Sequence, residues 1–265
     1  MNLLYWNLKS NRGLERIIKE CLHENDVDIA VFSEFDCVDF FELKNLLGDH
    51  YIRKNGLGIC KNVTMLCKSD IELSIIQEQQ RYMLATVNGK ERKYLLVGLH
   101  LPSNTHLNAS SRRKYTIRKI VNDIGRTESD ELIKITSSIV IGDMNASPFD
   151  PEMIEKDSFN SVLFKDIIRN NEVVKFQDDL FRRFYNPIIN FLNENDKSYG
   201  SFYYGSGDAC LYWYCYDQLL VRKDLIDEIK DYKYLKVINK RSLLKEVRPD
   251  SSISDHLPLF VSINI

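Results

Sequence analysis

The N-terminal part of the chain alternates between apolar runs and stretches of helical periodicity. An apolar run over residues 3–6 ends at Asn7, and a second, mainly apolar run over residues 28–32 leads into Ser33 and Glu34. Short runs of this kind, bounded by polar residues, predict buried strands. Between them the apolar residues recur at three- and four-residue intervals, which predicts an amphipathic helix capped by Ser10 or Asn11. The apolar face of this helix consists of Leu14, Ile17, Ile18, Cys21 and Leu22.

The middle of the chain is rich in β-type runs. Four of them follow one another between residues 58 and 101, separated by turn-forming residues, and predict a meander. A second amphipathic helix is predicted over residues 111–124, and another buried strand over residues 138–141 leads into Gly142 and Asp143. The four runs are Val63–Cys67, Ile71–Ile76, Met83–Val87 and Tyr94–Leu101.

The C-terminal part completes the pattern with a short helix over residues 186–193 and strands over residues 212–221 and 257–265. Strands that alternate with helices, together with a long meander, predict two packed sheets with helices on the outside. The fold class is therefore α/β (α+β). The chain has 265 residues and no linker-like or repetitive segment, so we expect a single domain over residues 1–265.

Composition and charge narrow the function only slightly. The chain has 36 Lys and Arg against 38 Asp and Glu, a formal net charge of -2. This balance argues against a protein that grips nucleic acid with its whole surface, so any polyanion would meet a local patch. Neither a secretory signal nor an apolar run near the ~18 residues of a membrane span is recognisable. We therefore expect a cytoplasmic protein without a membrane partner.

Polar residues stand where predicted strands end, a place from which side chains project towards a shared edge. Two further polar residues interrupt apolar strands. The first group consists of Asn7, Glu34, Asp143, Asn145, Asp255 and His256, and the second of His100 and Asp217.

Each of these residues also has a plainer explanation. Asn7 and Glu34 would serve to end strands and cap helices, and residues 142–145 would suit a turn. Asp217 and His256 would serve as hydrogen-bonded polar groups of the core. Their joint occurrence favours a site instead.

The combination of residue types indicates phosphodiester chemistry. Carboxylate and amide oxygens are the ligands that Mg²⁺ prefers. A neighbouring pair of His and Asp supplies a group that binds phosphate or moves a proton near neutral pH. Phosphodiester hydrolysis uses both, because a cation offsets charge on the phosphate while a second group orients the attacking water.

Six short motifs resemble, in order and approximate separation, those of the endonuclease/exonuclease/phosphatase superfamily. The most specific feature is GD-x-N followed much later by SDH. The superfamily includes pancreatic-type deoxyribonucleases, abasic-site endonucleases, sphingomyelinases, inositol-polyphosphate phosphatases and poly(A)-removing nucleases. The resemblance implies a four-layered α/β/β/α sandwich of two mostly antiparallel sheets. The motifs are WNLKSN, SEFD, LHLPS, GDMNASPFD, YDQLLV and SDHLPLF, and all of them lie within residues 2–264, so the resemblance covers essentially the entire chain.

The resemblance also implies a role for most of these residues. Glu34 and Asn7 would hold Mg²⁺ or Mn²⁺, with Asp255 as a further ligand or a neighbour of the metal. Asp143 would activate or orient the nucleophilic water, and Asn145 would fix Asp143 and contact the phosphate. His256, oriented by Asp217, would bind a phosphate oxygen or act as the base.

Two residues keep open roles. His100 stands where deoxyribonuclease-like branches tend to have histidine and abasic-site enzymes tyrosine, which lowers the abasic-repair interpretation. Its partner carboxylate in the deoxyribonuclease branch has no counterpart at residues 61–63, so His100 would act either as a general acid or as a phosphate ligand. Arg81 would reach the substrate phosphate or lie exposed at a strand edge.

The function predicted from the sequence is a metal-dependent nuclease that acts on DNA or RNA. A hydrolase of a small or lipid-borne phosphoester and a non-catalytic binding module are the alternatives, and a partner protein and the oligomeric state stay open. The basic residues at 112–119 and 230–248 would contact phosphates or form solvated faces. The aromatic residues within 201–216 would stack on bases or belong to the core.

Overall fold

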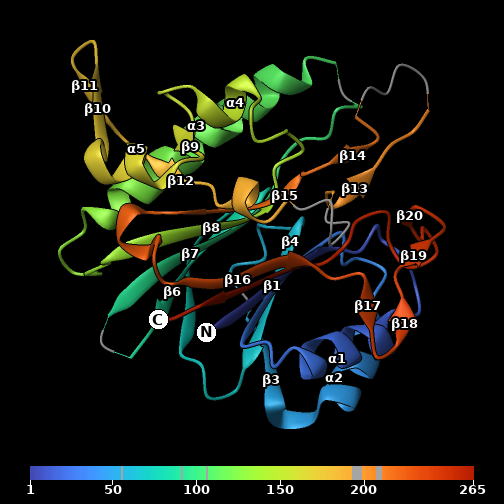
Figure 1. Ribbon diagram of the computed structural model, residues 1–265. Coiled ribbons are helices and arrows are strands. Elements are labelled where there is room, and N and C mark those ends of the chain that lie inside the picture. Colours follow the sequence, from blue (N-terminus) through green and yellow to red (C-terminus); the bar gives the residue numbers. More distant parts are fainter. Residues whose placement is uncertain (55, 91, 106, 193–198, 207–210) are drawn as a thin grey trace.

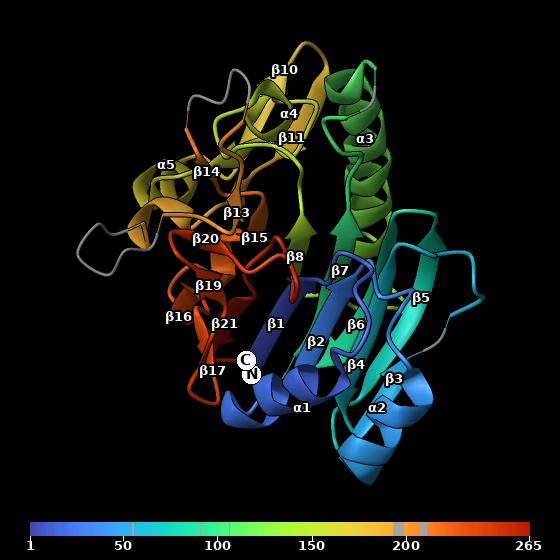
Figure 2. The ribbon, with the colours of Figure 1, turned by 90° about the vertical axis from the view of Figure 1, so that its right-hand side faces the viewer.

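The protein is a sandwich of four layers (Figures 1 and 2). The computed structural model describes residues 1–265 except 55, 91, 106, 193–198 and 207–210. Helices α1 (Glu15–Glu24) and α2 (Phe40–Leu47) cover one sheet, and α3 (Ala109–Glu128) and α4 (Pro151–Ile154) cover the other. This confirms the predicted α/β (α+β) fold of two packed, mostly antiparallel sheets flanked by helices.

The first sheet has six strands. Only β1 and β2 in it are parallel, and helix α1 makes the crossover between them. In sheet order, the strands are β16 (Ile229–Tyr234), β21 (Leu259–Ile263), β1 (Asn2–Asn7), β2 (Ile29–Ser33), β4 (Val63–Lys68) and β3 (Tyr51–Lys54).

The second sheet has seven strands. Its long parallel pair is β7 and β8, joined by helix α3, and the short strands β9 and β12 are also parallel. In sheet order, the strands are β5 (Leu73–Gln79), β6 (Tyr82–Asn88), β7 (Lys93–His100), β8 (Ser137–Asp143), β15 (Asp217–Val221), β12 (Phe184–Tyr185) and β9 (Ser161–Val162).

Smaller elements decorate the sandwich. They include helix α5 (Lys165–Asn170) and three 3₁₀ turns, η1 (Gly48–His50), η2 (Ile188–Asn190) and η3 (Lys223–Leu225). None of the helices in the described residues is long and apolar enough to cross a membrane. Four hairpins complete the fold: β10 (Val173–Phe176) with β11 (Asp179–Arg182), β13 (Phe202–Tyr203) with β14 (Trp213–Tyr214), β17 (Val237–Ile238) with β18 (Arg241–Ser242), and β19 (Leu244–Lys245) with β20 (Arg248–Pro249).

Strand β7 shows why its sequence is an almost continuous apolar run. Tyr94 and Leu96 belong to the core cluster that joins the two sheets, whereas Leu95, Val97 and Leu99 belong to a second cluster under helix α3. Successive side chains of a strand point to opposite faces. Because both faces of β7 are covered, both sets of positions are apolar.

The predicted cap of the first helix is wrong. Helix α1 begins at Glu15, with Leu14 at the N-cap and no side-chain cap. Ser10 lies in a left-handed turn with φ of 49°. The side chain of Asn11 donates instead to the carbonyl oxygens of Ser251 and Ile253, at 3.0 Å each, and so ties this loop to the C-terminal part of the chain.

Three predicted elements differ in the structure from the prediction. Strand β4 pairs with β2 and β3 in the first sheet, so the meander consists of β5, β6 and β7 alone. The run 212–221 breaks into β14 and β15, which lie in different sheets. The helix expected over residues 186–193 is reduced to η2, before which the Asn186 side chain accepts from the backbone N–H of Ile188 at 3.1 Å. Asn193 lies outside the described residues.

The basic residues at the start of α3 are not merely a solvated face. Arg113 is buried and binds Glu152 through Nε at 2.8 Å and Nη2 at 2.6 Å. Lys114 and Arg118 pair with Glu155 and Asp157. These pairs fasten α3 to α4 and to the segment after it.

Gly98 on β7 marks a close approach of the two sheets. A Cβ atom there would lie 2.7 Å from both Met65 Cε and Val31 Cγ1, on strands of the opposite sheet. Such distances are shorter than van der Waals contact, so the sheets would have to separate locally.

We expect Gly98→Ala to lower the free energy of unfolding by about 1–3 kcal/mol, the range typical of overpacking. Urea unfolding followed by circular dichroism measures the change. Gly125→Ala in α3 is the matched control, because an added Cβ atom there would meet no described atom within 4 Å beyond its own helix. Alanine is favoured over glycine in a helix by about 0.5–1 kcal/mol, so the control should gain stability. Equal stability of Gly98→Ala and the wild type would contradict this expectation.

Candidate active site

The candidate site forms where the parallel strand pairs of both sheets end. In the first sheet Asn7 pairs with Ser33, which Glu34 follows. In the second sheet Asp143 has His100 as its register partner on one side and Asp217 on the other. The sheets pack face to face, so five of these residues converge on one edge of the sandwich: Asn7, Glu34, His100, Asp143 and Asp217.

Asn7 joins the two sheets at this edge. Its side-chain Nδ2 donates to Glu34 Oε1 at 3.1 Å and to Asp143 Oδ2 at 3.3 Å. Its Oδ1 accepts from the backbone N–H of Lys9 at 2.9 Å, which fixes the orientation of the amide. Asn7 therefore holds two carboxylates together in this conformation, while its role as an oxygen ligand of a metal stays a prediction.

His256 and Asp217 form a buried pair. His256 Nδ1 lies 2.8 Å from Asp217 Oδ2, and His256 Nε2 points to Asp143, with Oδ2 at 4.0 Å. This leaves Nε2 as the atom that faces the site. The pair has the geometry in which a carboxylate sets the orientation and tautomer of an imidazole.

Burial and charge shift the pKa values of this cluster. Burial raises the pKa of Asp143 to about 7, although the neighbouring His256 acts in the opposite direction. Burial alone would lower the pKa of His256, but the charge and hydrogen bond of Asp217 outweigh it and raise this pKa to about 10. At neutral pH, His256 is therefore a cation with a proton on Nε2, and Asp143 is able to exchange a proton.

His100 lies beside the carboxylates without a hydrogen bond from its ring. Its Nε2 is 3.7 Å from both Glu34 Oε1 and Asp143 Oδ2. Burial lowers the pKa of His100 to about 4, so the ring is neutral. His100 Nδ1 and Asp217 Oδ1 are buried and have no partner in the described part of the chain. Buried polar atoms nearly always bind a partner, so these two unpaired atoms call for an explanation, and a ligand bound in the site would supply one.

The remaining predicted residues surround this centre. Asn145 has φ of 47°, and its backbone N–H donates to Asp143 Oδ1 at 2.8 Å. Asp255 is half-exposed and lies 3.7 Å from Lys9 Nζ. Half-buried Arg81 stands in the turn before β6, with Nη1 3.5 Å from the carbonyl oxygen of His100.

Two residues that hold the site together were not among the candidates named from the sequence. The hydroxyl of Ser254 donates to the carbonyl oxygen of Asn7 at 2.6 Å and accepts from the backbone N–H of His256 at 3.0 Å. Trp6 Nε1 donates to the carbonyl oxygen of His256 at 3.1 Å. Together they fasten the His256 loop to the end of β1. Both stand in the quoted motifs, Trp6 in WNLKSN and Ser254 in SDHLPLF, and this is the signal that could have identified them.

The residues present fit a hard divalent cation. Ligand atoms of Asp143, Asp217 and His256 lie within 4.8 Å of one another. The bond between His256 and Asp217 occupies one atom of each, which leaves Asp143 and the nearby Glu34 as the oxygen donors. Mg²⁺ sites typically use one or two carboxylates. Because Asp143 is buried, a cation beside it would offset the cost of its negative charge.

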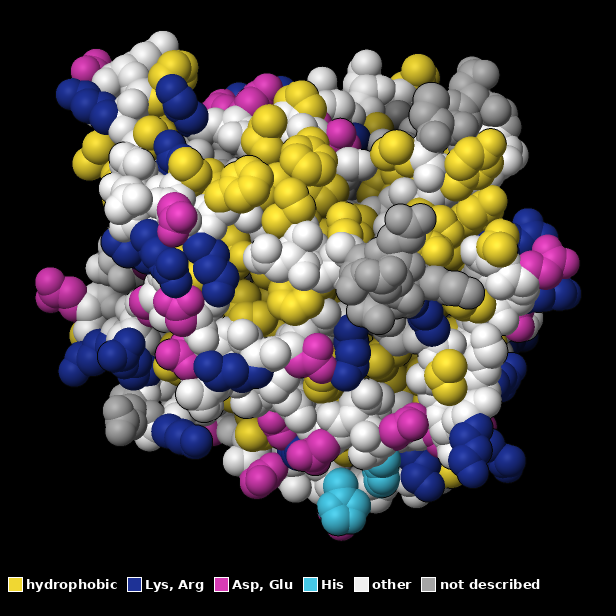
Figure 3. All heavy atoms as spheres, in the orientation of Figure 1, with side chains coloured by type: hydrophobic (Ala, Val, Ile, Leu, Met, Phe, Trp, Pro, Cys, Tyr) yellow, Lys and Arg dark blue, Asp and Glu magenta, His cyan; other side chains and the backbone are white. Residues whose placement is uncertain are grey.

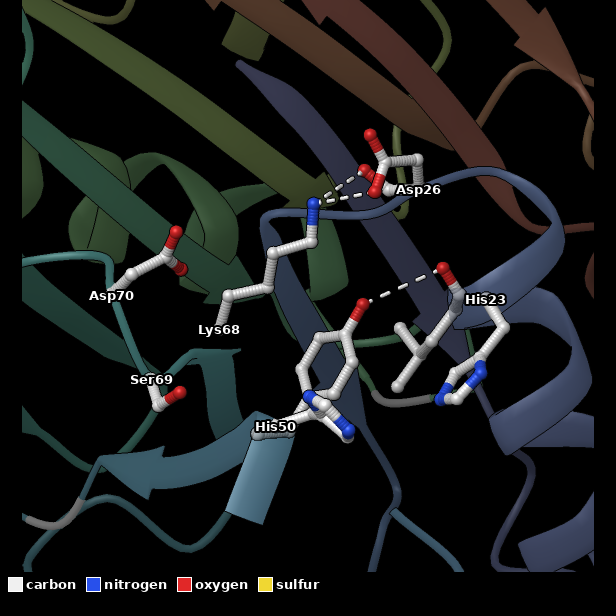
Figure 4. A pocket seen from close by; sticks show the side chains of 8 residues that line it. His23, Asp26, His50, Lys68, Ser69 and Asp70 are labelled. Carbon is white, nitrogen blue, oxygen red and sulfur yellow. Dashed lines mark hydrogen bonds and ion pairs between the residues drawn. The ribbon is translucent and has the colours of Figure 1, made fainter. Parts of the chain in front are cut away.

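A separate cavity lies at the opposite end of β2 (Figure 4). It has a volume of about 580 Å³ and is lined by polar residues that include His23, His50 and Lys68. Lys68 Nζ already binds Asp26 and Asp28, at 2.6 and 2.7 Å. The Lys68 ammonium group is thus paired within the chain. The cavity lies away from the candidate site and is not part of it.

Comparison with known proteins rests on structure alone, since no protein-family model and no curated protein matches the sequence. A humanized Danio rerio TDP2 has a TM-score of 0.62 at 15% identity, covering 100% of this chain and 99% of its own. An AP endonuclease from Archaeoglobus fulgidus has a TM-score of 0.54 at 16% identity, and the match covers 100% of both chains. An endonuclease/exonuclease/phosphatase family protein from Bacteroides thetaiotaomicron has a TM-score of 0.57 at 13% identity. The match covers 98% of this chain and 96% of that protein. The chain has the fold of the endonuclease/exonuclease/phosphatase superfamily.

Proposed function

We propose that the protein hydrolyses phosphodiester bonds of DNA or RNA with the aid of a divalent cation. One observation carries the proposal. Asp143 lies between a group of oxygen donors, Glu34 and Asn7, and an imidazole held by a carboxylate, His256 with Asp217. Phosphodiester hydrolysis needs these two kinds of group on either side of the reacting phosphate.

In this proposal Glu34 and Asn7 hold Mg²⁺ or Mn²⁺, with Asp255 nearby. Such an ion, when bound, would neutralise charge that develops on the phosphate oxygens. Asp143 orients the attacking water and accepts its proton, because a pKa of about 7 allows both charge states at neutral pH.

His256 donates a hydrogen bond from Nε2 to a phosphate oxygen. Its raised pKa favours this role over that of a general base, since a base must be unprotonated. His100, which is neutral, and Arg81 supply further donors on the opposite rim. Asn145 fixes Asp143 through its backbone N–H, while its side-chain Nδ2 donates to the carbonyl oxygen of Leu101 at 3.0 Å. Contact with the phosphate would therefore use the side-chain oxygen or follow a change of this bond.

The shared fold supports a phosphoester hydrolase. One similar structure is described as an AP endonuclease, and another as a family protein whose name joins nucleases with phosphatases. A small or lipid-borne phosphoester remains the alternative substrate, and the substrate panel below separates it from nucleic acid.

We expect hydrolysis in Mg²⁺ or Mn²⁺ that is lost in EDTA and falls at least ~100-fold in Asp143→Asn, because the water loses the group that orients it. Labelled single- and double-stranded DNA, RNA and bis(p-nitrophenyl) phosphate serve as substrates. Asp70→Asn is the matched control, since Asp70 is exposed and lines the cavity at the opposite end of β2.

Metal-dependent cleavage of a polymer would support the nuclease, and cleavage of the simple diester alone would favour the small-substrate alternative. If the wild-type protein hydrolyses none of these substrates with metal present, the proposed activity is contradicted. That result would leave a non-catalytic binding module.

We expect Asp217→Asn to lower kcat by roughly 10²–10⁴-fold with little change in KM, as follows when a catalytic imidazole loses its orienting carboxylate. Steady-state kinetics on the best substrate measures both constants. Asp224→Asn, which alters an exposed acid that accepts from Ser137 Oγ at 2.7 Å, should keep the wild-type kcat. A wild-type kcat in Asp217→Asn would rule out the orienting role.

A further inference from the structure

The hairpin of β13 and β14 is built directly onto the catalytic residues. Ser201 Oγ accepts from the backbone N–H of Asp217 at 3.1 Å, and Ser201 O accepts from the backbone N–H of Leu257 at 2.8 Å. Phe202 forms a β-bridge with His256. The base of the hairpin is therefore fixed to both members of the imidazole and carboxylate pair.

A series of aromatic rings leads away from His256 along this hairpin. The Phe202 ring lies 4.8 Å from the His256 ring and stacks on Tyr216 at 5.4 Å, between centroids. Tyr216 in turn lies 5.1 Å from Tyr214. These distances fall in the range of favourable aromatic contacts. Asn104 Nδ2 donates to the Tyr216 hydroxyl at 3.1 Å and so steadies the middle of the series.

The outer part of the hairpin leaves rings open to solvent. Tyr204 is 47% exposed and Tyr212 51% exposed, while Tyr203 packs edge-to-face on Trp213 at 5.5 Å. Figure 3 shows hydrophobic side chains gathered over the upper part of the face on which Figure 1 places this hairpin. Clusters of exposed apolar surface beside a site are typical of ligand binding.

The opposite rim of the site carries positive charge. Arg81 lies beside His100, and Arg112 is close enough to lower the pKa of Arg81 further than burial alone does. Neither arginine forms an ion pair within the described residues, whereas Arg113 next to Arg112 is fully paired with Glu152. Guanidinium groups without a carboxylate partner suit phosphate oxygens.

We propose that the β13–β14 hairpin is a stacking platform for an unpaired nucleobase next to the scissile phosphate, so that the substrate is a single-stranded nucleic acid. The platform consists of Phe202, Tyr204, Tyr214 and Tyr216. This inference rests on the proposed function of the site and specifies its substrate.

The physical reason for a single strand lies in access to the base. A base within a duplex is covered on both faces by its neighbours, whereas an unpaired base offers a face to an aromatic side chain. Rings on one side of the cleavage centre and unpaired guanidinium groups on the other match the bases and phosphates of one strand. A small phosphoester would need only the phosphate side.

Binding of fluorescein-labelled oligonucleotides to Asp143→Asn protein in Mg²⁺ tests the platform, because this background slows cleavage. The probes are a single strand, its duplex, and a single strand of equal length with abasic sites throughout. We expect the base-bearing strand to bind about 10-fold more tightly than the abasic one, which corresponds to about 1.4 kcal/mol. The duplex should bind more weakly than the single strand.

Added substitutions locate the effect. Tyr214→Leu and, as a variant at a more exposed position, Tyr204→Leu should each reduce the preference for bases at least severalfold. Tyr115→Leu on α3, where the ring is 62% exposed, is the matched aromatic control and should keep the preference. Circular dichroism confirms that each variant is folded.

Equal binding of base-bearing and abasic strands would overturn the inference, as would a preference that survives both substitutions or equal binding of the duplex. Hydrolysis of the substrate panel above by the wild-type protein reports the proposed function separately. Hydrolysis without base-dependent binding removes the platform alone, and base-dependent binding without hydrolysis of any substrate removes the proposed catalysis alone.

Discussion

Carboxylates crowd one end of the sandwich, two of them buried, and the arrangement of the site follows from their charge. Glu34, Asp143 and Asp217 meet there because strands β1 and β2 of one sheet and β7 and β8 of the other end at the same edge. Buried charge is costly unless it is paired. Asn7 donates to two of the carboxylates and His256 pairs with the third, yet burial still raises the pKa of Asp143. The remaining charge is what suits this edge to a cation.

Local features of the sequence predict much of this arrangement. Apolar runs that end in Asn7, Glu34 and Asp143 identify both the strands and the residues at their ends, and the structure brings these residues together. Local periodicity does not show which strands pair when they are distant in the sequence. For that reason the sheet to which β4 belongs could not be predicted, nor could the break between β14 and β15.

The sequence also could not decide the role of side chains that suit two different structural roles. Arg113 lies in a basic run typical of a solvated face, but its partner Glu152 is 39 residues away and makes it a buried anchor. Asn11 resembles a helix cap, yet its partners Ser251 and Ile253 lie near the other terminus. Only the fold supplies such partners.

Catalysis and recognition are assigned to different kinds of structure in this protein. Most groups assigned to chemistry stand at strand ends, which hold them rigidly, and the loop that carries His256 is bonded to the end of β1. The aromatic rings assigned to recognition stand on a short hairpin fixed to those strands through Ser201 and Phe202.

The most direct test of the proposed metal-dependent chemistry is anomalous diffraction from crystals grown with Mn²⁺. We expect a peak bonded to the Glu34 carboxylate, within reach of Asp143. A peak only in the cavity beside His23 and His50, or none at this edge at saturating Mn²⁺, would contradict the proposed metal site.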